Sequence, residues 1–243
     1  MGFASACRSI TSCTHLKSWR HVETGGPEEM DGARQFAGWD EAAFEVLLRL
    51  DGEPSSELMR EVRKDRERLV REPMVSLLHD LAWADPAFED HSVWRYGKTA
   101  WWWQNQSAVV RLAPNIEIGL RFNLDGLHVQ GAWWYADTLQ IGRFRAAVAA
   151  EPSGTELGDL VSDLRNKGFE ITGDLLKRVP RDYPTDHPRA DLLRHRSLLA
   201  VRHLGCDDWL QTPEAVDRVL ATHRQLRPLL SWLTANVGAE RAR

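Results

Sequence analysis

The chain has 243 residues, enough to bury a sizeable core in one large domain or two small ones. Hydrophobic residues make up 43% of it and charged residues 27%, a composition that argues against disorder over most of its length. The formal net charge of -4 gives no reason to expect nucleic acid or an anionic membrane as a partner.

The three cysteines, Cys7, Cys13 and Cys206, lack the spacing of a metal site, which favours a reducing compartment over a disulfide framework. No run approaches the roughly 18 apolar residues of a membrane span, and the N-terminus lacks the apolar centre of a secretory signal. We therefore expect a cytoplasmic protein that does not bind a membrane.

Residues 1–35 mix Ser, Thr, Gly and charged side chains without periodicity, which predicts a disordered leader. The composition does not decide whether translation begins at Met1 or Met30. We expect a single domain over 36–238 and a short tail over 239–243.

Two helical patterns follow the leader. Asp40 is a candidate cap for a helix that ends at Asp51, and Ser55 or Ser56 for a second helix, which Pro73 kinks or restarts. Basic side chains alternate with Glu and Asp along the second helix, which predicts a solvent-exposed face made by Arg60, Arg63, Lys64, Arg66, Arg68 and Arg71.

The middle of the chain has the period of β-strands. Residues 107–112 predict one strand, and 116–124 alternate between apolar and polar side chains, as in a strand with one buried face. Asp125-Gly126 predicts a tight hairpin turn with positive φ angles, followed by a partner strand over 127–135. One face of that strand is a candidate pocket wall and carries His128, Gln130, Ala132 and Trp134.

Helices are expected again in the last third. Their start signals are the capping-box pairs Asp137 with Gln140 and Ser153 with Glu156, and the pair Thr212-Pro213. Helices on both sides of the central strands predict an α+β fold: an antiparallel sheet in the middle of the chain flanked by N- and C-terminal helices.

A conspicuous pattern runs through the C-terminal half: Leu176-Lys177, Pro180-Arg181, Tyr183, Asp186-His187-Pro188 and Leu192-Leu193-Arg194. With these residues, the chain from about 36 to 237 resembles a family of bacterial conserved hypothetical proteins, domain of unknown function twenty-four sixty-one. The resemblance implies one α+β domain and no settled activity. The family's Arg-Asp-x-Arg-Phe-Ser signature leading into Pro-Tyr-Lys-Thr is missing, and only residues 95–99 stand in its place.

Histidines and arginines concentrate in 175–204. Arg181 lies in a proline-constrained loop and is a candidate for a bidentate contact to a carboxylate or phosphate. The alternative is an internal ion pair, in which Arg181 or Arg194 contacts Asp182 or Asp191.

His187, Asp191 and His195 have the four-residue spacing of a metal-binding helix face. However, Pro188 is typical of a first helical residue, which would place His187 outside that face, in a capping position. Capping is therefore favoured over metal binding.

Other chemical signatures are incomplete or absent. Gly97-Lys98-Thr99 resembles the end of a phosphate-binding loop, but Val93 occupies the position of its first glycine. The common nucleophile-elbow, zinc-protease and paired-cysteine motifs do not occur. The sequence thus identifies no catalytic residue, predicts no metal or other cofactor, and does not decide whether the protein is an enzyme.

Two functions follow from these candidates. In the first, the protein binds a small anionic ligand, or is an enzyme acting on one, in a pocket formed by Arg181, His187, Lys98, Tyr183, Trp102 and Trp134. In the second, some of the 11 tryptophans form an exposed patch that binds a protein partner or a second copy of the chain without catalysis.

Overall fold

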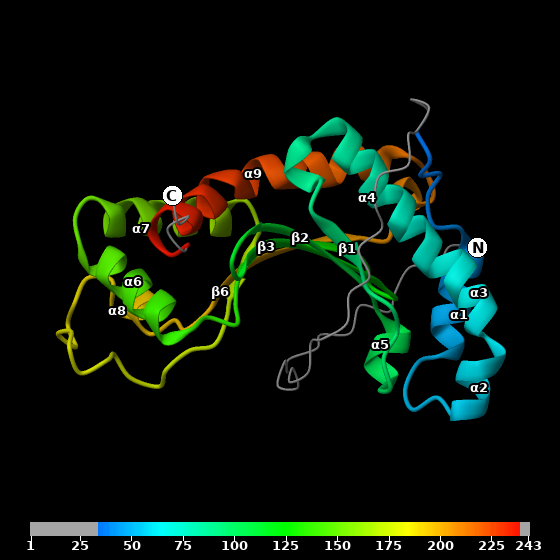
Figure 1. The fold of residues 1–243 in the computed structure, drawn as a ribbon, viewed down its shortest axis with the longest axis horizontal. Helices are drawn as coiled ribbons and strands as arrows, with labels where there is room; N and C mark the ends of the chain where they lie inside the picture. The colour runs from blue at the N-terminus through cyan, green and yellow to red at the C-terminus, as the bar shows by residue number, and fades with distance from the viewer. Residues whose placement is uncertain (1–33, 239–243) are drawn as a thin grey trace.

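The computed structural model describes residues 34–238, so the tail and all but two residues of the expected leader lie outside them. Its centre is a six-stranded sheet in the order β1-β2-β3-β4-β6-β5, with all neighbours antiparallel (Figure 1). The strands are β1 His91–Val93, β2 Gln106–Ala113, β3 Ile116–Asn123, β4 Gly126–Trp133, β5 Glu170–Thr172 and β6 Leu198–Gly205. The predicted α+β fold with a central antiparallel sheet is confirmed.

Helices precede, interrupt and follow the strands. Before β1 come α1 Glu41–Arg49, α2 Ser56–Glu61, α3 Arg63–Arg66, the π-helical turn η1 Glu67–Arg71, α4 Glu72–Ala84 and the 3-10 turn η2 Pro86–Phe88. Within and after the sheet come α5 Ala100–Gln104, α6 Thr138–Ala149, α7 Ser153–Asn166, α8 Ala190–Leu193, the 3-10 turn η3 Asp208–Gln211 and α9 Glu214–Asn236. None of these described helices is both long and apolar enough to cross a membrane.

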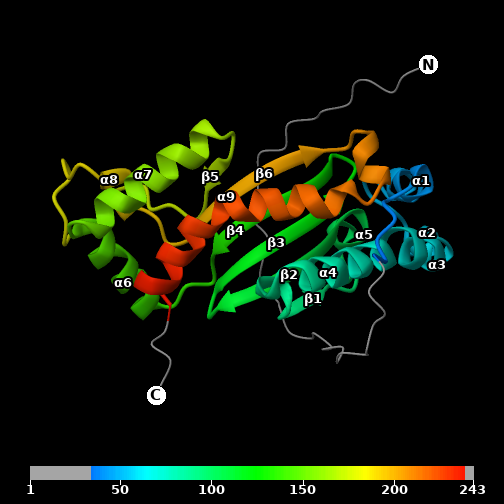
Figure 2. The same ribbon diagram turned by 90° about the horizontal axis from the view of Figure 1, so that it is seen from above.

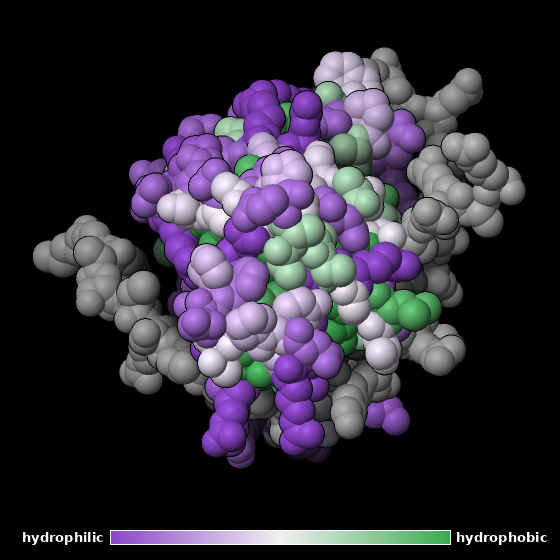
Figure 3. All heavy atoms as spheres, turned by 90° about the vertical axis from the view of Figure 1, so that its left-hand side faces the viewer, coloured by the Kyte–Doolittle hydropathy of each residue, from purple (hydrophilic) through white to green (hydrophobic). Residues whose placement is uncertain are grey.

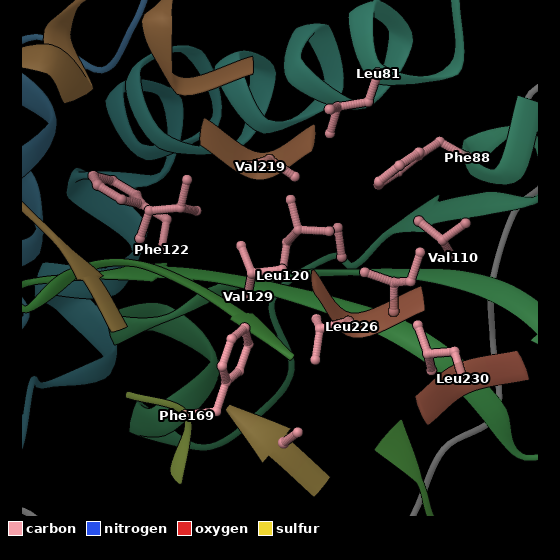
Figure 4. Packing of buried hydrophobic residues seen from close by; sticks show 14 of the residues in the cluster. Leu81, Phe88, Val110, Leu120, Phe122, Val129, Phe169, Val219, Leu226 and Leu230 are labelled. Atoms are coloured by element: carbon pink, nitrogen blue, oxygen red, sulfur yellow. The ribbon is translucent and has the colours of Figure 1, made fainter. Parts of the chain in front are cut away.

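The core lies between one face of the sheet and the helices α4 and α9 (Figure 2). Leu120 and Val129 are cross-strand partners on this face, and Figure 4 shows them close to Val219 and Leu226 of α9. Gly131 allows α9 to approach closely, because a Cβ there would lie 3.2 Å from a methyl group of Leu226. The predicted pocket-wall face of β4 therefore points away from α9.

The β3–β4 hairpin forms where the sequence predicts it, with a different turn. Asn123 pairs with Gly126, so the two turn residues are Leu124 and Asp125 and not Asp125-Gly126. The Asn123 side chain accepts a hydrogen bond from the Asp125 N–H at 2.9 Å, which stabilises the turn locally. Of residues 123–126, only Gly126 has a positive φ, of 94°, and a Cβ there would overlap the carbonyl of Gly205.

The predicted helix caps are confirmed in part. Asp137 accepts a hydrogen bond from the Gln140 N–H at 2.7 Å, but the Gln140 side chain donates to the Pro114 carbonyl and does not complete a capping box. The box predicted at Ser153 is wrong: Ser153 is already the first residue of α7, and its hydroxyl donates to the Ala147 carbonyl at 2.7 Å. This hydroxyl instead ties α7 to the end of α6.

Pro73, predicted to kink or restart the second helix, does not restart it: the helix continues without a break from η1 into α4, with a wider turn before the proline. Pro73 has no N–H, so the carbonyl of Leu69 has no α-helical partner, and the preceding residues form the π-helical turn η1. The indole of Trp39 donates to the Val70 carbonyl at 3.1 Å. The segment before α1 therefore docks on this turn.

Asp80 of α4 holds the start of the described chain. Its carboxylate accepts hydrogen bonds from the backbone N–H groups of Gln35 and Phe36, at 2.9 and 3.0 Å. Arg34 pairs with Asp217 of α9 at 3.1 Å. The last two residues of the expected leader thus contact the folded domain.

Arg66 is buried, so the expectation that all six basic residues form a solvent-exposed face is wrong for this one. Its guanidinium donates to the carbonyls of Trp103, Trp102 and Asn105 at 2.8, 2.8 and 2.9 Å, and to the Gln106 side chain at 3.2 Å. Burial lowers the pKa of Arg66 to about 10, which leaves it charged at neutral pH. These bonds join α3 to α5 and to the start of β2.

We expect Arg66→Ala to lower the free energy of unfolding by about 3–5 kcal/mol, because it leaves a cavity and several buried carbonyls without donors. Arg68→Ala is the matched control, since the Arg68 side chain is 65% exposed, and should change stability by at most about 0.5 kcal/mol. Urea unfolding of both variants measures the difference. Equal losses would contradict a structural role for the buried guanidinium.

Candidate functional site

The strand register separates the six predicted ligand residues into two groups. β2 begins at Gln106 opposite Phe122, whereas β4 ends at Trp133 opposite Ile116. The helix α5 precedes β2 and Trp134 follows β4, so they lie at opposite ends of eight-residue strands, roughly 25 Å apart. Lys98, just before α5, and Trp102, within it, are therefore far from Trp134.

The family-like loop emerges at the Trp134 end. β5 ends and β6 begins there, because Thr172 pairs with Leu199 and Trp133 pairs with Leu198. Residues 173–197 connect these two strands and include α8 (Figures 1 and 2). We call this segment the arginine loop. It carries Arg181, Tyr183 and His187, and both of its ends lie at the Trp134 end of the sheet, opposite the end that holds Lys98 and Trp102.

Arg189 fixes the arginine loop to the connection between α6 and α7. Its side chain, 14% exposed, donates to the carbonyls of Val148 and Ala149 at 2.7 and 3.2 Å. It also contacts the Glu151 carboxylate at 2.6 Å and the Thr155 hydroxyl at 3.1 Å. Hydrogen bonds from Thr155 and Arg189 lower the pKa of Glu151.

Two further arginines brace the loop from within. Arg194 donates to the Leu176 carbonyl at 2.8 Å and pairs with Asp191 at 3.3 Å. Arg196 pairs with Asp174 at 2.7 Å. The alternative of an internal ion pair is therefore confirmed for Arg194 and Asp191.

The other three cations of the loop, Lys177, Arg178 and Arg181, are exposed. No hydrogen bond or ion pair joins them to any residue between 34 and 238, including the neighbouring Asp182. Figure 3 views this end of the molecule and shows a largely hydrophilic surface broken by smaller hydrophobic areas. The loop thus combines a braced backbone with three cations whose charge faces solvent.

His187 shapes the backbone before α8. Its Nδ1 accepts a hydrogen bond from the Arg189 N–H at 3.0 Å, and its carbonyl accepts one from the Ala190 N–H at 2.9 Å. The helix begins at Ala190, so the prediction of Pro188 as its first residue is wrong, although His187 does cap the turn. Tyr183 is half-buried and packs against the core.

The spacing of His187, Asp191 and His195 does not produce a metal site. Asp191 is exposed, whereas His195 is buried and its Nδ1 lies 2.8 Å from the Ser197 carbonyl. Burial lowers the pKa of His195. Within 34–238, no three His, Cys, Asp or Glu residues are grouped so as to hold a metal ion.

Glu117 is a titratable group that the sequence reasoning missed. It lies on the sheet face that points away from α9, opposite Arg111 on β2, and accepts a hydrogen bond from the Trp134 indole. Burial raises the pKa of Glu117 to about 7, and the bond from Trp134 and the charge of Arg111 only partly oppose this. This carboxyl therefore titrates close to neutral pH. Its position in an alternating strand is the only signal in the sequence.

His128 lies on the same face, nearer the α5 end of the sheet. Its ring is 4% exposed, packs edge-to-face against His203 at 4.5 Å, and has Nε2 at 3.1 Å from Asn123 Oδ1. Burial lowers the pKa of His128 to about 3, with the charges of Arg121 and His203 adding to the effect. This imidazole is therefore neutral at physiological pH.

The tryptophans of α5 pack mainly on each other and on the core. Trp102 is half-buried and contacts Trp94 and Trp101, with ring centroids 5.4 and 5.1 Å apart. Trp103 is 8% exposed, whereas Trp101 is 38% exposed. Lys98, just before the helix, is exposed. Trp102, one of the two tryptophans in the predicted ligand set, thus packs against other aromatic rings.

These features define an α+β protein in which two helices cover one face of an antiparallel sheet and an arginine-braced loop closes one end. A family model described as "Conserved hypothetical protein (DUF2461)" matches residues 90–232, which include the whole sheet, the loop and most of α9. The chain belongs to this family, as its sequence pattern indicated. No curated protein and no solved structure matches the chain.

The raised pKa of Glu117 has a consequence for stability. The carboxyl titrates near 4.5 in the unfolded chain and near 7 in the folded protein, so the folded state binds the proton more tightly. Its favourable contribution is complete below about pH 4.5 and is lost as the pH rises through about 7.

We therefore expect Glu117→Gln to raise the free energy of unfolding at pH 8 by on the order of 3 kcal/mol, and to change it little at pH 4. The amide oxygen can still accept the Trp134 hydrogen bond. Urea unfolding at the two pH values measures the effect. Glu170→Gln, an exposed carboxylate on the same sheet, is the matched control. An equal gain for both variants would contradict the assignment.

Proposed function

We propose that this protein binds a small anionic molecule at the arginine loop, through Lys177, Arg178 and Arg181. One observation carries the proposal: these cations lie close together in sequence, are exposed and have no counter-ion between residues 34 and 238. Other arginines of the same loop are used to hold its backbone. The net charge of -4 makes this a local concentration of positive charge.

The bracing favours binding because a loop that is already ordered loses less conformational entropy when a ligand arrives. Arg181 lies between Pro180 and Pro184, and the Tyr183 N–H donates to the Pro180 carbonyl at 3.1 Å, so its backbone is held in a turn. A guanidinium on such a mount is suited to bidentate contact with carboxylate or phosphate oxygens. The exposure of all three cations favours a water-soluble ligand over an apolar one.

If the bound molecule undergoes a reaction, Glu117 is the candidate acid or base. It lies at the end of the sheet from which the arginine loop emerges, and its pKa of about 7 suits proton transfer in either direction at neutral pH. Trp134 contacts it directly and would form an aromatic wall. Glu117 is therefore the one residue to which we assign a catalytic role, should the protein be an enzyme.

The alternative, a protein-interaction module built on an exposed tryptophan patch, has weaker support. Trp102 and Trp134 are both half-buried, and Trp83, which is 75% exposed, lies on α4. The family resemblance and the few cysteines support a bacterial cytoplasmic protein.

Calorimetric titration with pyrophosphate and with citrate at low ionic strength tests the proposal. We expect at least one of them to bind, and Arg181→Gln to weaken binding about tenfold, or about 1.4 kcal/mol. Arg60→Gln, which removes an exposed arginine from α2, is the matched control and should leave the affinity unchanged. Absence of binding at millimolar concentration, or equal losses in the two variants, would overturn the proposal.

A further inference from the structure

A second candidate site lies on the helix-covered side of the sheet. An open groove of about 510 Å³ runs between the C-terminal half of α9, the turn that follows α4 and the end of β2. Its polar lining includes Asp85, His223 and Arg227, and its apolar lining includes Ala87, Leu112 and Leu230. The volume is in the range of small-molecule sites in proteins. None of these residues belongs to the arginine loop.

Asp85 and His223 form the inner part of the polar lining. One carboxylate oxygen of Asp85 accepts a hydrogen bond from the Ala87 N–H at 2.9 Å, which fixes the side chain. The other lies 3.4 Å from Nδ1 of His223, an imidazole that is 2% exposed and has no closer partner for this nitrogen within the described residues. The imidazole also packs edge-to-face on Phe88, with ring centroids 5.0 Å apart.

The charge of Asp85 is not cancelled by this histidine. Burial lowers the pKa of His223, and the charges of Arg227 and Arg224 lower it further against the opposing effect of Asp85, so the imidazole is neutral at neutral pH. Arg227 lies one helical turn beyond His223 and is exposed. It makes no hydrogen bond or ion pair with the part of the chain that the structure describes.

The groove therefore presents a carboxylate and a guanidinium that do not neutralise each other. A simple anion would be attracted by Arg227 and repelled by Asp85, and a simple cation would meet the reverse. A molecule with both charges satisfies the two groups together. The apolar walls next to them favour a short hydrocarbon chain on that molecule.

We propose that this groove binds a free amino acid with an aliphatic side chain. The ammonium group contacts Asp85, the carboxylate contacts Arg227, and the side chain lies against Ala87, Leu112 and Leu230. The groove acts as a binding site and not as a hydrolytic one. Its exposed hydroxyls, Ser231 and Thr234, are eight and eleven residues after His223, about 12 and 16 Å along the helix, and so beyond hydrogen-bond reach of the imidazole.

Four probes separate the contributions of the ligand groups. Leucine carries both charges and an aliphatic chain, 4-methylpentanoate lacks the ammonium, 3-methylbutylamine lacks the carboxylate, and glycine lacks the chain. By calorimetric titration of the full chain, we expect leucine to bind and each of the other three to bind at least tenfold more weakly. No binding of leucine at millimolar concentration, or equal binding of 4-methylpentanoate, would overturn the proposal.

Variants of the groove residues test whether leucine binds there. Asp85→Asn keeps an oxygen that accepts the Ala87 N–H, and Arg227→Gln removes an exposed charge, so both should fold, which circular dichroism verifies. Each is expected to weaken leucine binding at least tenfold, whereas Arg224→Gln, on the same helix outside the groove, should not. Unchanged affinity in both groove variants would refute the site. Arg181→Gln should leave leucine binding intact, which separates this site from the arginine loop.

Discussion

The packing of α9 onto the sheet is the contact on which the rest of the structure depends. Glycine at position 131 favours this close approach, since a Cβ there would lie 3.2 Å from Leu226 and 3.3 Å from Leu230, whose side chains would have to shift. Because this contact buries one face of β3 and β4, strand alternation directs Glu117 and His128 to the opposite face. The same helix provides one wall of the groove that contains His223. One packing contact thus places polar groups on both sides of the molecule.

A second constraint holds the N-terminal helices to α5 and the sheet. Arg66 satisfies carbonyls of α5 and the residue after it, groups that would otherwise be buried at a helix end without donors. Its charge is tolerated because the guanidinium donates four hydrogen bonds and packs near the rings of Tyr96 and Trp103. The same principle operates in the arginine loop, where Arg189 and Arg194 donate to backbone carbonyls. In both places arginine is structural, and only the arginines left outside such networks are candidates for ligand binding.

The predictions from sequence were most accurate where the signal is local. The β3–β4 hairpin apart from its turn residues, the cap at Asp40, a cap at Ser55 or Ser56, and the long helix after Pro213 were predicted, because each depends on residues a few positions apart. The strands β1 and β5 were not, since three residues are too few to show a period. The eight-residue strand β6 was also missed, because only helices were expected in the last third of the chain. The candidate site stays a prediction: the register places Trp134 and both ends of the arginine loop at one end of the sheet, and Lys98 and Trp102 at the other.

By itself, the sequence determined the α+β class, the central hairpin and the family, because periodicity, turn residues and a motif in fixed order are properties of neighbouring positions. Only the tertiary structure decided which arginines are buried or paired. Arg66 meets partners about 40 residues away, and Arg189 meets Val148 at a separation of 41. It also decided that Glu117 loses enough water to titrate near neutral pH. Desolvation and ion pairing depend on distance in space, and a linear pattern of charges carries no measure of that distance.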